Sequence, residues 1–477
     1  MRCLLISPRA KTGGLESLRS GNQILQGVLY IAAAVRKAGH FAIVTIADAT
    51  DIETHIRKYK PDVLGVSCVT ATYPIARDLI IRAKQLFPDL KTIIGGHHAT
   101  FMYKEVIEET GVDYVCRGEG EEIFCALLNA MEQDKTNPLH SPVSSPAMGI
   151  EGIVYKHGNK FYNDNQIAIL DNLDDLPRIT LDLVAEGLSF SPKIVSSRGC
   201  PYKCSFCSIS AFYNGKYRQR KVMDVISDIE EYVSWGATSF WFHDDNLTVD
   251  TAWVEDFCRT LIKKRIRISW NCMSRVDTIC KYPDLIRLMA AAGCKLLAIG
   301  IESGIPEVLK RMHKKIDDSQ IRQAIKILNS IKISHNWYMI IGSGDEFDQP
   351  RYIEQNIEFF ASRPFGYVLI SVLTPFPGTE LYNNLASENR LLHQKWEQYD
   401  ATHCVYQPLG MSPKQLENYL PIAYRKVYFR KGLRLIPLLY NSFRSHAIRP
   451  SMIWNGLIAI FRNYVLGQSL DRVLQKK

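Results

Sequence analysis

Three cysteines lie close together in the middle of the chain. In the stretch SSRGCPYKCSFCSIS, residues 196–210, Cys200, Cys204 and Cys207 follow a C-x3-C-x2-C spacing. Soft thiolates suit zinc, copper(I) or iron–sulfur clusters, and closed structural zinc sites take four ligands. Three thiolates could instead hold a [4Fe–4S] cluster whose fourth iron stays free for a substrate or cofactor. The spacing favours that open cluster over a zinc site completed by a distant Cys or His, or over three incidental thiols.

The elements around these cysteines alternate between strand and helix from about residue 192 to 402. Short apolar runs predict strands, and longer runs with helical periodicity separate them. We expect strands at residues 193–199, 239–245, 267–273, 295–303, 334–343 and 366–375, with helices at 224–236, 251–264, 282–293 and 318–331. Such repeats indicate a partial (β/α)6 or whole barrel, whose chemistry lies at the carboxyl ends of its strands. The cysteines follow the first of these strands.

The first segment, residues 1–135, also alternates strands with helices. Apolar runs predict strands at 2–7, 41–48, 62–69, 91–96 and 113–118, with helices such as 26–39 and 73–87 between them. This order predicts a doubly wound, Rossmann-like α/β sheet, in which ligands bind at loops leaving the carboxyl ends of the strands. No G-x-G-x-x-G follows the first strand, which disfavours a nicotinamide or flavin dinucleotide.

The loops at those strand ends contain the candidate binding residues of the first segment. They hold Ser67, Thr70, Gly95, Gly96, Gly118 and Glu119. The glycine pair at 95 and 96 would let a flat ligand approach the backbone closely. Tight turns alone would account for these glycines equally well.

Two further segments complete the expected organisation. Residues 136–191 form a linker rich in Pro and Ser, with a hairpin over 152–164 that turns at residues 157–159. Residues 403–477 form a helical, basic region with apolar pieces. From Pro421 to Lys477 eleven Lys or Arg stand against one acid, a charge of +10, so the preceding 420 residues carry −1 of the net +9. The basicity therefore belongs to the tail.

The composition is that of a folded chain with two or three domains. It has 477 residues, of which 46% are hydrophobic and 22% charged. The amino terminus lacks the apolar stretch and cleavage site of a secretory signal, so we expect a cytoplasmic protein. In that reducing compartment twelve cysteines are too sparse for a disulfide scaffold, and the clustered ones are candidates for metal ligands.

The stretch GCPYKCSFCS resembles the cluster motif of the radical S-adenosylmethionine (SAM) enzymes, and the resemblance extends over about residues 192–400. It implies that Cys200, Cys204 and Cys207 hold the cluster, with Phe206 as the aromatic residue before the third cysteine. In that family SAM chelates the fourth iron, and one electron cleaves it to a 5′-deoxyadenosyl radical.

Later positions extend this resemblance. FHDDN at 242–246, CMSRVD at 272–277, GIES at 300–303 and LTPFPGTELY at 373–382 occur in the order found in the family. The resemblance implies that Asp244 meets the methionine amino group, that Arg275 lies beside the cofactor and that Glu302 faces its ribose. Read without it, Asp244 and Asp245 could cap the next helix, and Glu302 could be a solvated strand end.

The first segment resembles the cobalamin-binding domain of the B12-dependent branch of that superfamily. The resemblance rests on VLGVSCVTATYP, IIGGHHATF and YVCRGEGEE, and it implies that cobalamin is contacted by Ser67, Thr70, Gly95, Gly96, Gly118 and Glu119. The D-x-H-x-x-G motif, whose His coordinates cobalt in methionine-synthase-like domains, is absent. We therefore do not assign His97 or His98 as cobalt ligands.

Together the two resemblances imply a cobalamin-dependent radical SAM methyltransferase that acts on an unactivated carbon. One SAM would supply the methyl group through cobalamin and a second the radical, with electrons from a flavodoxin or ferredoxin. Such a carbon has no lone pair for ordinary methyl transfer, so the protein need only position the reactants and exclude water. A radical cyclase or another non-methylating radical enzyme would keep the same features. A corrin or metal carrier would not need GIES or the open cluster.

The basic tail bears on substrate and location. Its apolar pieces, such as LIPLLY and MIWNGLIAIF, are far shorter than the ~20 residues that span a bilayer. Interleaved basic and apolar residues are typical of an interfacial helix, which predicts peripheral contact with the inner face of an anionic membrane. Helices packed on the barrel are the alternative, and the apolar interruptions disfavour nucleic acid. A hydrophobic substrate follows, such as a hopanoid-like lipid or a bacteriochlorophyll-type tetrapyrrole.

Overall fold

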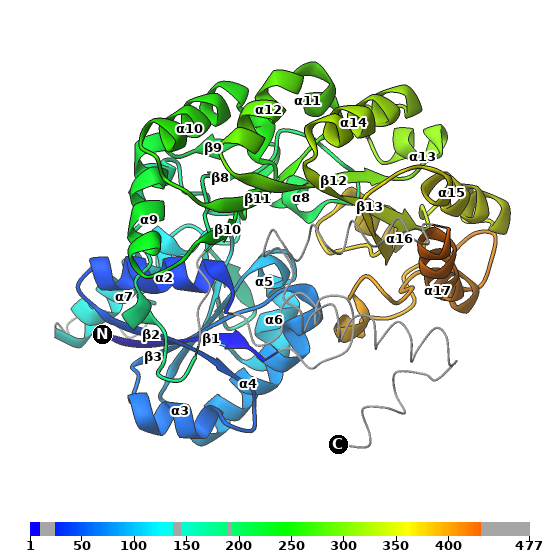
Figure 1. Ribbon diagram of the computed structural model, residues 1–477. Helices are drawn as coiled ribbons and strands as arrows, with labels where there is room; N and C mark the ends of the chain where they lie inside the picture. Colours follow the sequence, from blue (N-terminus) through cyan, green and yellow to red (C-terminus); the bar gives the residue numbers. More distant parts are fainter. Residues whose placement is uncertain (10–23, 137–144, 189–192, 431–477) are drawn as a thin grey trace.

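The computed structural model describes residues 1–9, 24–136, 145–188 and 193–430. Figure 1 shows two α/β units, the first drawn in blue and cyan and the second in green to yellow, with the last described helix beside the second unit. The α/β class and the order of the two units along the chain agree with the prediction.

The first unit is built on a seven-stranded sheet with the order β2-β1-β3-β4-β5-β6-β7. Its strands are β1 (Arg2–Pro8), β2 (Phe41–Ala47), β3 (Val63–Ser67), β4 (Lys91–Gly95), β5 (Tyr114–Cys116), β6 (Ile153–His157) and β7 (Lys160–Tyr162). The first five pair in parallel. Parallel strands are covered on both faces and read as continuous apolar runs, and β1 and β2 are buried along all but their first residue. The predicted doubly wound sheet is confirmed.

Helices cover both faces of this sheet. They are α2 (Gln26–Lys37), α3 (Ile52–Tyr59), α4 (Tyr73–Leu86), α5 (His97–Phe101), α6 (Tyr103–Thr110) and α7 (Glu121–Thr136). Leu29 of α2 and Phe124 of α7 pack into the core on one face. Leu79 of α4 and Val106 of α6 pack into the core on the other. This layering leaves the carboxyl ends of the strands as the place for a ligand.

The predicted hairpin is present and adds its two strands to the first sheet. β6 and β7 are antiparallel and turn at Gly158, whose φ is +58°. β6 in turn pairs antiparallel with β5, where Cys116 lies opposite Ile153. The hairpin therefore covers the β5 edge, which would otherwise leave backbone groups unpaired.

The second unit holds five parallel strands in the order β10-β11-β12-β13-β14. They are β10 (Ser239–Trp241), β11 (Ser269–Ser274), β12 (Cys294–Glu302), β13 (Ser334–Ile341) and β14 (Tyr367–Val372). The helices around them are α9 (Val222–Ser234), α10 (Thr251–Lys263), α11 (Val276–Lys281), α12 (Pro283–Ala291), α13 (Pro306–Arg311), α14 (Asp318–Ile331) and α15 (Pro350–Ser362). Figure 1 shows these helices along the outer side of the curved sheet, which is a partial barrel as expected.

The first expected strand of this barrel, residues 193–199, is shorter than predicted. Ile194 makes one parallel bridge toward β10, and the chain then leaves the barrel to form a small antiparallel ladder. The two strands of that ladder are β8 (Ser197–Arg198) and β9 (Arg218–Gln219). The barrel strand ends early because the side chain of Asp244 accepts hydrogen bonds from the backbone amides of Ser196 and Ser197. Those amides are unavailable to a barrel ladder.

The described chain ends in two further helices, α16 (Glu380–Ser387) and α17 (Pro413–Phe429). A capping box between Ser412 and Gln415 starts α17. The hydroxyls of Tyr424 and Tyr428 donate to carbonyls of β14 and so occupy the open edge of the barrel sheet. Among the described helices none is long and apolar enough to cross a bilayer. The predicted basic tail beyond Arg430 lies outside the described residues.

Candidate functional site

The three cysteines lie in one loop, residues 199–217, whose ends are joined by the β8–β9 ladder. All three are half-buried, and the amide of Cys207 donates to the carbonyl of Cys204 over 3.1 Å. Burial, with smaller contributions from the neighbouring Cys207, Asp245 and Cys204, raises the pKa of Cys200 to about 11. In the described parts of the chain, no three His, Cys, Asp or Glu residues gather closely enough to hold a single metal ion. A cluster does not require that, because each thiolate binds a different iron.

Three residues of the second unit also contact this cysteine loop. The amide of Leu381 donates to the carbonyl of Ser205 at 3.0 Å, and the hydroxyl of Ser205 donates to the carbonyl of Arg311 at 3.2 Å. The ring nitrogen Nδ1 of His313 lies 3.0 Å from the carbonyl of Lys203. Leu381 belongs to the LTPFPGTELY stretch, which is thereby brought against the cysteines.

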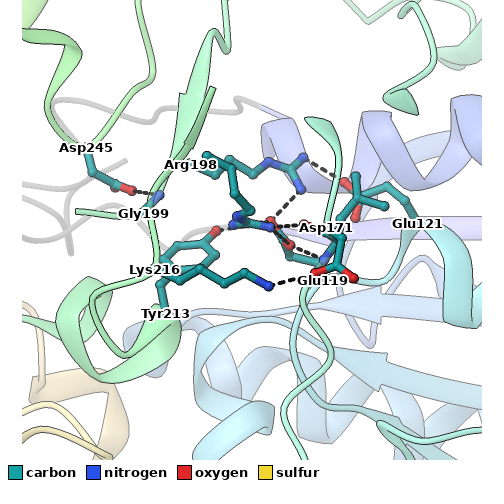
Figure 2. Close-up of polar contacts among 10 residues, drawn as sticks. Glu119, Glu121, Asp171, Arg198, Gly199, Tyr213, Lys216 and Asp245 are labelled. Carbon is teal, nitrogen blue, oxygen red and sulfur yellow. Dashed lines mark hydrogen bonds and ion pairs between the residues drawn. The ribbon is translucent and has the colours of Figure 1, made fainter. Parts of the chain in front are cut away.

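Both aspartates of FHDDN bind the start of the cysteine loop. Asp244 accepts from the amide of Ser196 at 2.9 Å. Asp245 accepts from the amide of Gly199 at 3.0 Å, and Figure 2 shows this second contact. Burial raises the pKa of Asp244 to about 7 and that of Asp245 to about 6. The alternative that they cap the next helix is wrong, because Asp250 caps α10. The contact of Asp244 with the methionine amino group stays a prediction.

Glu302 ends β12 in a left-handed conformation, with φ of +73°. The ladder to β13 shifts register between Gly300 and Glu302. The carboxylate of Glu302 lies 2.9 Å from Nζ of Lys314, and both side chains are buried. Lys314 also donates to the carbonyl of Gly300 at 3.1 Å. Glu302 is therefore not a solvated strand end, and its contact with the ribose stays a prediction.

Arg275 lies beside the cysteine loop. Its guanidinium carbon is 3.5 Å from the ring centroid of Tyr202, and its Nε is 3.0 Å from a carboxylate oxygen of Asp277. Tyr202 lies between the first and second cysteines, so this cation–π contact puts Arg275 near the predicted cluster. Phe206 is partly buried and packs against the barrel core.

In the first unit, four of the six candidate residues line one narrow cavity of about 50 Å³ at the carboxyl end of the sheet. These residues are Ser67, Gly95, Gly96 and Gly118. Gly96 and Gly118 have φ of +96° and +107°, and a Cβ at either position would overlap a neighbouring backbone carbonyl. Thr70 lies nearby in a short 3₁₀ turn, η1 (Thr70–Thr72), and is buried. The structure therefore brings these loops together at one cavity, and the contact of their residues with cobalamin stays a prediction.

The side chain of Glu119 reaches the second unit. Its carboxylate lies 2.9 Å from Arg198 and 2.5 Å from Arg218 (Figure 2). Burial alone would raise the pKa of Glu119, but the hydrogen bond from Arg218 and the charges of both arginines hold it below its usual value. Sequence reasoning missed both arginine partners. The available signals were only the acids of RGEGE and an arginine on each side of the cysteine loop.

The short helix α5, which follows β4, faces the cysteine loop. The ring of His97 lies 4.7 Å from that of Phe212 in α8 (Ser208–Tyr213), which is part of the cysteine loop. His98 is held between Tyr73 and Trp396, with ring centroids 4.2 and 4.8 Å away. Burial lowers the pKa of His97 to about 4 and that of His98 to about 3, so both are neutral at pH 7.

Two family models match the chain. The model of the B12 binding domain matches residues 23–128, and that of the Radical SAM superfamily matches residues 194–382. The chain belongs to the B12-binding radical SAM enzymes. Its cofactors are therefore cobalamin, SAM and a [4Fe–4S] cluster.

Relatives of this B12-binding radical SAM enzyme extend over most of the chain. An uncharacterized methyltransferase from Pyrococcus horikoshii is 28% identical over 473 residues, 97% of this chain and 99% of that protein. An anaerobic magnesium-protoporphyrin IX monomethyl ester cyclase from Cereibacter sphaeroides is 24% identical over 460 residues, 93% of this chain and 73% of that protein. A hopanoid C-3 methylase from Methylococcus capsulatus is 25% identical over 391 residues, 80% of this chain and 72% of that protein.

The fold is also similar to that of a solved structure. A radical SAM methyltransferase from Kitasatospora setae, with cobalamin and a [4Fe–4S] cluster bound, matches with a TM-score of 0.64 at 17% identity. The match covers 81% of this chain and 78% of that one. At this identity the match concerns the fold.

The residues present in the radical SAM and B12-binding domains fit these cofactors. Three half-buried thiols in one loop are the soft ligand set that a cluster with one open iron needs. In the B12-binding domain the cavity is bordered by Gly96 and Gly118, where a side chain would collide with the backbone. These two glycines let the loops that border the cavity pack closely against the backbone of Cys68 and Ala168.

Proposed function

We propose that this B12-binding radical SAM enzyme is a methyltransferase that methylates an unactivated carbon of a hydrophobic substrate. The observation that carries the proposal is the approach of the two cofactor loops. His97 of the B12-binding domain and Phe212 of the cysteine loop have ring centroids 4.7 Å apart. A methyl donor held on one side and a radical source held on the other would therefore meet across one site.

In this proposal each residue has a limited task. When bound, the cluster with SAM supplies one-electron chemistry, and cobalamin supplies a transferable methyl group. Cys200, Cys204 and Cys207 hold the cluster, while Glu302 and Arg275 orient SAM from the barrel side. The aromatic pair of His97 and Phe212 helps to exclude water from the space between the cofactors. A flavodoxin or ferredoxin would supply the electrons.

The class of substrate is supported by the relatives. The hopanoid methylase named above acts on a lipid, and the cyclase acts on a tetrapyrrole, as their names state. We propose a substrate of this kind, a hopanoid-like lipid or a bacteriochlorophyll-type tetrapyrrole. A non-methylating reaction such as ring closure is the second candidate, since the cyclase matches 93% of this chain.

One experiment separates these two functions. The full chain is reconstituted anaerobically with iron, sulfide and hydroxocobalamin, then incubated with a reduced flavodoxin or ferredoxin, SAM carrying a deuterated methyl group and an extract of lipids or tetrapyrroles. A methyltransferase forms both S-adenosylhomocysteine and 5′-deoxyadenosine and puts the label into a hydrophobic product. A cyclase forms 5′-deoxyadenosine with an unlabelled product. Formation of S-adenosylhomocysteine without any labelled product would contradict the methylation of either substrate class.

Cysteine variants supply the matched control for this assay. Cys204→Ala removes a predicted cluster ligand, so it should abolish 5′-deoxyadenosine formation. Cys280→Ala changes another half-buried thiol, on α11, whose Sγ contacts the carbonyl of Gln320 at 3.2 Å. It should leave 5′-deoxyadenosine formation near the wild-type level. Turnover that survives Cys204→Ala would refute the radical reading of the site.

We also propose peripheral contact with a membrane through the end of α17. Phe429 there is 79% exposed. A shallow groove at the same place is lined by Ile422, Arg425, Lys426, Phe429 and Arg430. An exposed aromatic side chain among basic residues is the combination that anionic lipid surfaces attract.

A further inference from the structure

The cysteine loop is closed by a ladder that carries two opposed arginines. In the β8–β9 pair, Arg198 lies directly opposite Arg218, one just before the loop and one just after it. Like charges directly opposite each other destabilise a pair of antiparallel strands. The closure of the loop that holds Cys200, Cys204 and Cys207 therefore depends on groups that neutralise these two arginines.

Glu119 lies between the two arginines. Its Oε1 is 2.9 Å from Nη1 of Arg198 and its Oε2 is 2.5 Å from Nη1 of Arg218. The side chains of Glu119, Arg198 and Arg218 are only 4%, 12% and 7% exposed. Arg198 also pairs with Glu121 at 2.6 Å (Figure 2). Two buried acids thus balance two buried bases, and charge-assisted bonds of this kind are strong.

Glu119 comes from the B12-binding domain, while both arginines belong to the radical SAM domain. The neighbouring residue Gly118 lines the cavity at the end of the first sheet. The main chain is fixed at this point, because the amide of Glu119 donates to the carbonyl of Ala168 at 2.8 Å. The amide of Leu170 donates to the Glu119 carboxylate at 2.6 Å. A shift of the cavity wall at Gly118 would therefore move the carboxylate that closes the cysteine loop.

We propose that Glu119 is a positioning residue through which the B12-binding domain holds the cysteine loop closed, so that occupation of the cobalamin cavity tightens the cluster-binding loop. This role is independent of the substrate and holds for a methyltransferase or a cyclase. Its failure would leave the proposed function untouched, because the test below uses no substrate and measures no turnover.

The test measures hydrogen–deuterium exchange of the full chain, reconstituted anaerobically, with and without hydroxocobalamin. Glu119→Gln keeps the shape of the side chain but leaves the two opposed arginines with one acid, Glu121, which pairs with Arg198. We expect fragments of residues 199–217 to exchange about a hundredfold faster, because breaking a buried ion pair uncovers an uncompensated charge. Exchange in α14, on the outer side of the barrel, should not change.

Asp171→Asn is the matched control. Asp171 also pairs with the cysteine loop, through Lys216 at 2.7 Å, but its side chain is 90% exposed (Figure 2). The same acid-to-amide change there should alter exchange of residues 199–217 by less than about threefold, since exposed ion pairs contribute little.

The change in exchange on adding hydroxocobalamin distinguishes the proposed role of Glu119 from a purely structural one. A purely structural role would leave that change the same in the wild type and in Glu119→Gln. In the wild type and in Asp171→Asn, hydroxocobalamin should slow exchange of residues 199–217. In Glu119→Gln this protection should vanish. A Glu119→Gln chain that exchanges at the wild-type rate and keeps the protection would overturn the proposal.

A double variant in which the charges balance is the control for the case in which Glu119→Gln unfolds the whole chain. In Glu119→Gln with Arg218→Gln, the remaining Arg198 and Glu121 are still paired, so basal exchange of residues 199–217 should return to within about tenfold of the wild type. The protection by hydroxocobalamin should stay absent, because the carboxylate of Glu119 that joins the cavity wall to the ladder is missing. If the single variant unfolds, this double variant decides, and retained protection in it would overturn the proposal.

Discussion

At the scale of single residues, Glu302 has a strained backbone conformation at the end of β12. A non-glycine residue with φ of +73° is uncommon, and such conformations cost roughly 1–3 kcal/mol. The ion pair with Lys314, which is itself fixed to the carbonyl of Gly300, holds the carboxylate in that position. A strained residue at a strand end, fixed by a buried partner, is typical of ligand-binding positions.

Lys314→Met should therefore weaken SAM binding. The variant leaves the Glu302 carboxylate without its buried partner, and we expect the dissociation constant for SAM to rise by about tenfold, as for the loss of one charge-assisted hydrogen bond. Equilibrium dialysis against the reconstituted enzyme measures this. Lys315→Met is the control, because Lys315 is exposed and next in the chain. Equal SAM affinity in both variants would show that Lys314 does not position Glu302.

His98 makes a second prediction at this scale, about pH. Burial lowers its pKa from 6.5 to about 3, so below pH 6.5 the unfolded chain takes up a proton that the folded chain does not. The free energy of unfolding must then decrease as the pH falls through this window, by about 1.4 kcal/mol per pH unit for this residue. Between pH 6.5 and about pH 5 the wild type should lose about 2 kcal/mol more than His98→Phe.

Urea unfolding at several pH values tests this prediction. Phe keeps a ring between Tyr73 and Trp396, so the variant retains the aromatic packing. His157→Phe, at the exposed end of β6, should follow the wild-type pH profile. Parallel profiles for the wild type and His98→Phe would mean that His98 takes up its proton equally in both states.

At the scale of elements, the strands of both domains could be predicted from their burial patterns. The run at 41–48 is apolar and became β2, which is buried along all but its first residue. The run at 334–343 became β13, whose residues alternate between partly buried and buried over its first half. The prediction of a first barrel strand over residues 193–199 was wrong because the amide of Ser196 donates to Asp244, which is 48 residues further along the chain. The ion pairs of Glu119 with Arg198 and Arg218 were missed for the same reason. Local periodicity carries no information on such long-range side-chain contacts.

Gly96 allows a prediction about the loop between β4 and α5. Its φ of +96° and ψ of −179° lie in a region that only glycine occupies readily, and a Cβ would overlap the carbonyl of Cys68. Gly39 has φ of +88°, but a Cβ there would meet nothing within 4 Å. Gly96→Ala should therefore lower the free energy of unfolding by about 3 kcal/mol or more, and Gly39→Ala by about 1 kcal/mol.

The same two variants test the binding role of the loop. Gly96→Ala should also fail to retain hydroxocobalamin after desalting, while Gly39→Ala should retain it, as judged by the absorption spectrum. Retention by a folded Gly96→Ala chain would show that this cavity is not the cobalamin cradle.

At the scale of the whole molecule, the two domains behave as one packed body. Trp396 and Tyr399, which follow the barrel, are buried in the same core as Leu79 of the B12-binding domain. The buried ion pairs of Glu119 join the domains at a second place. A site between two domains that share a core can be held with little movement, which suits chemistry that depends on placing several reactants together.

The basic tail leads to the last prediction, which concerns binding of the protein to a membrane surface. Residues 431–477 contain eight Lys or Arg and one acid, and they follow the exposed Phe429 at the end of α17. Each basic residue near an anionic lipid surface contributes about 1 kcal/mol, so the full chain should float with vesicles of phosphatidylglycerol and much less with phosphatidylcholine. Deleting residues 431–477 should lower the partition coefficient for anionic vesicles by at least about a hundredfold.

A variant with the tail Lys and Arg changed to Gln separates charge from apolar contact, and the salt dependence of wild-type binding should vanish in it. If the full chain and the truncated chain stayed equally in the supernatant, the tail would have no lipid contact, and a lipid substrate would have to reach the site from solution.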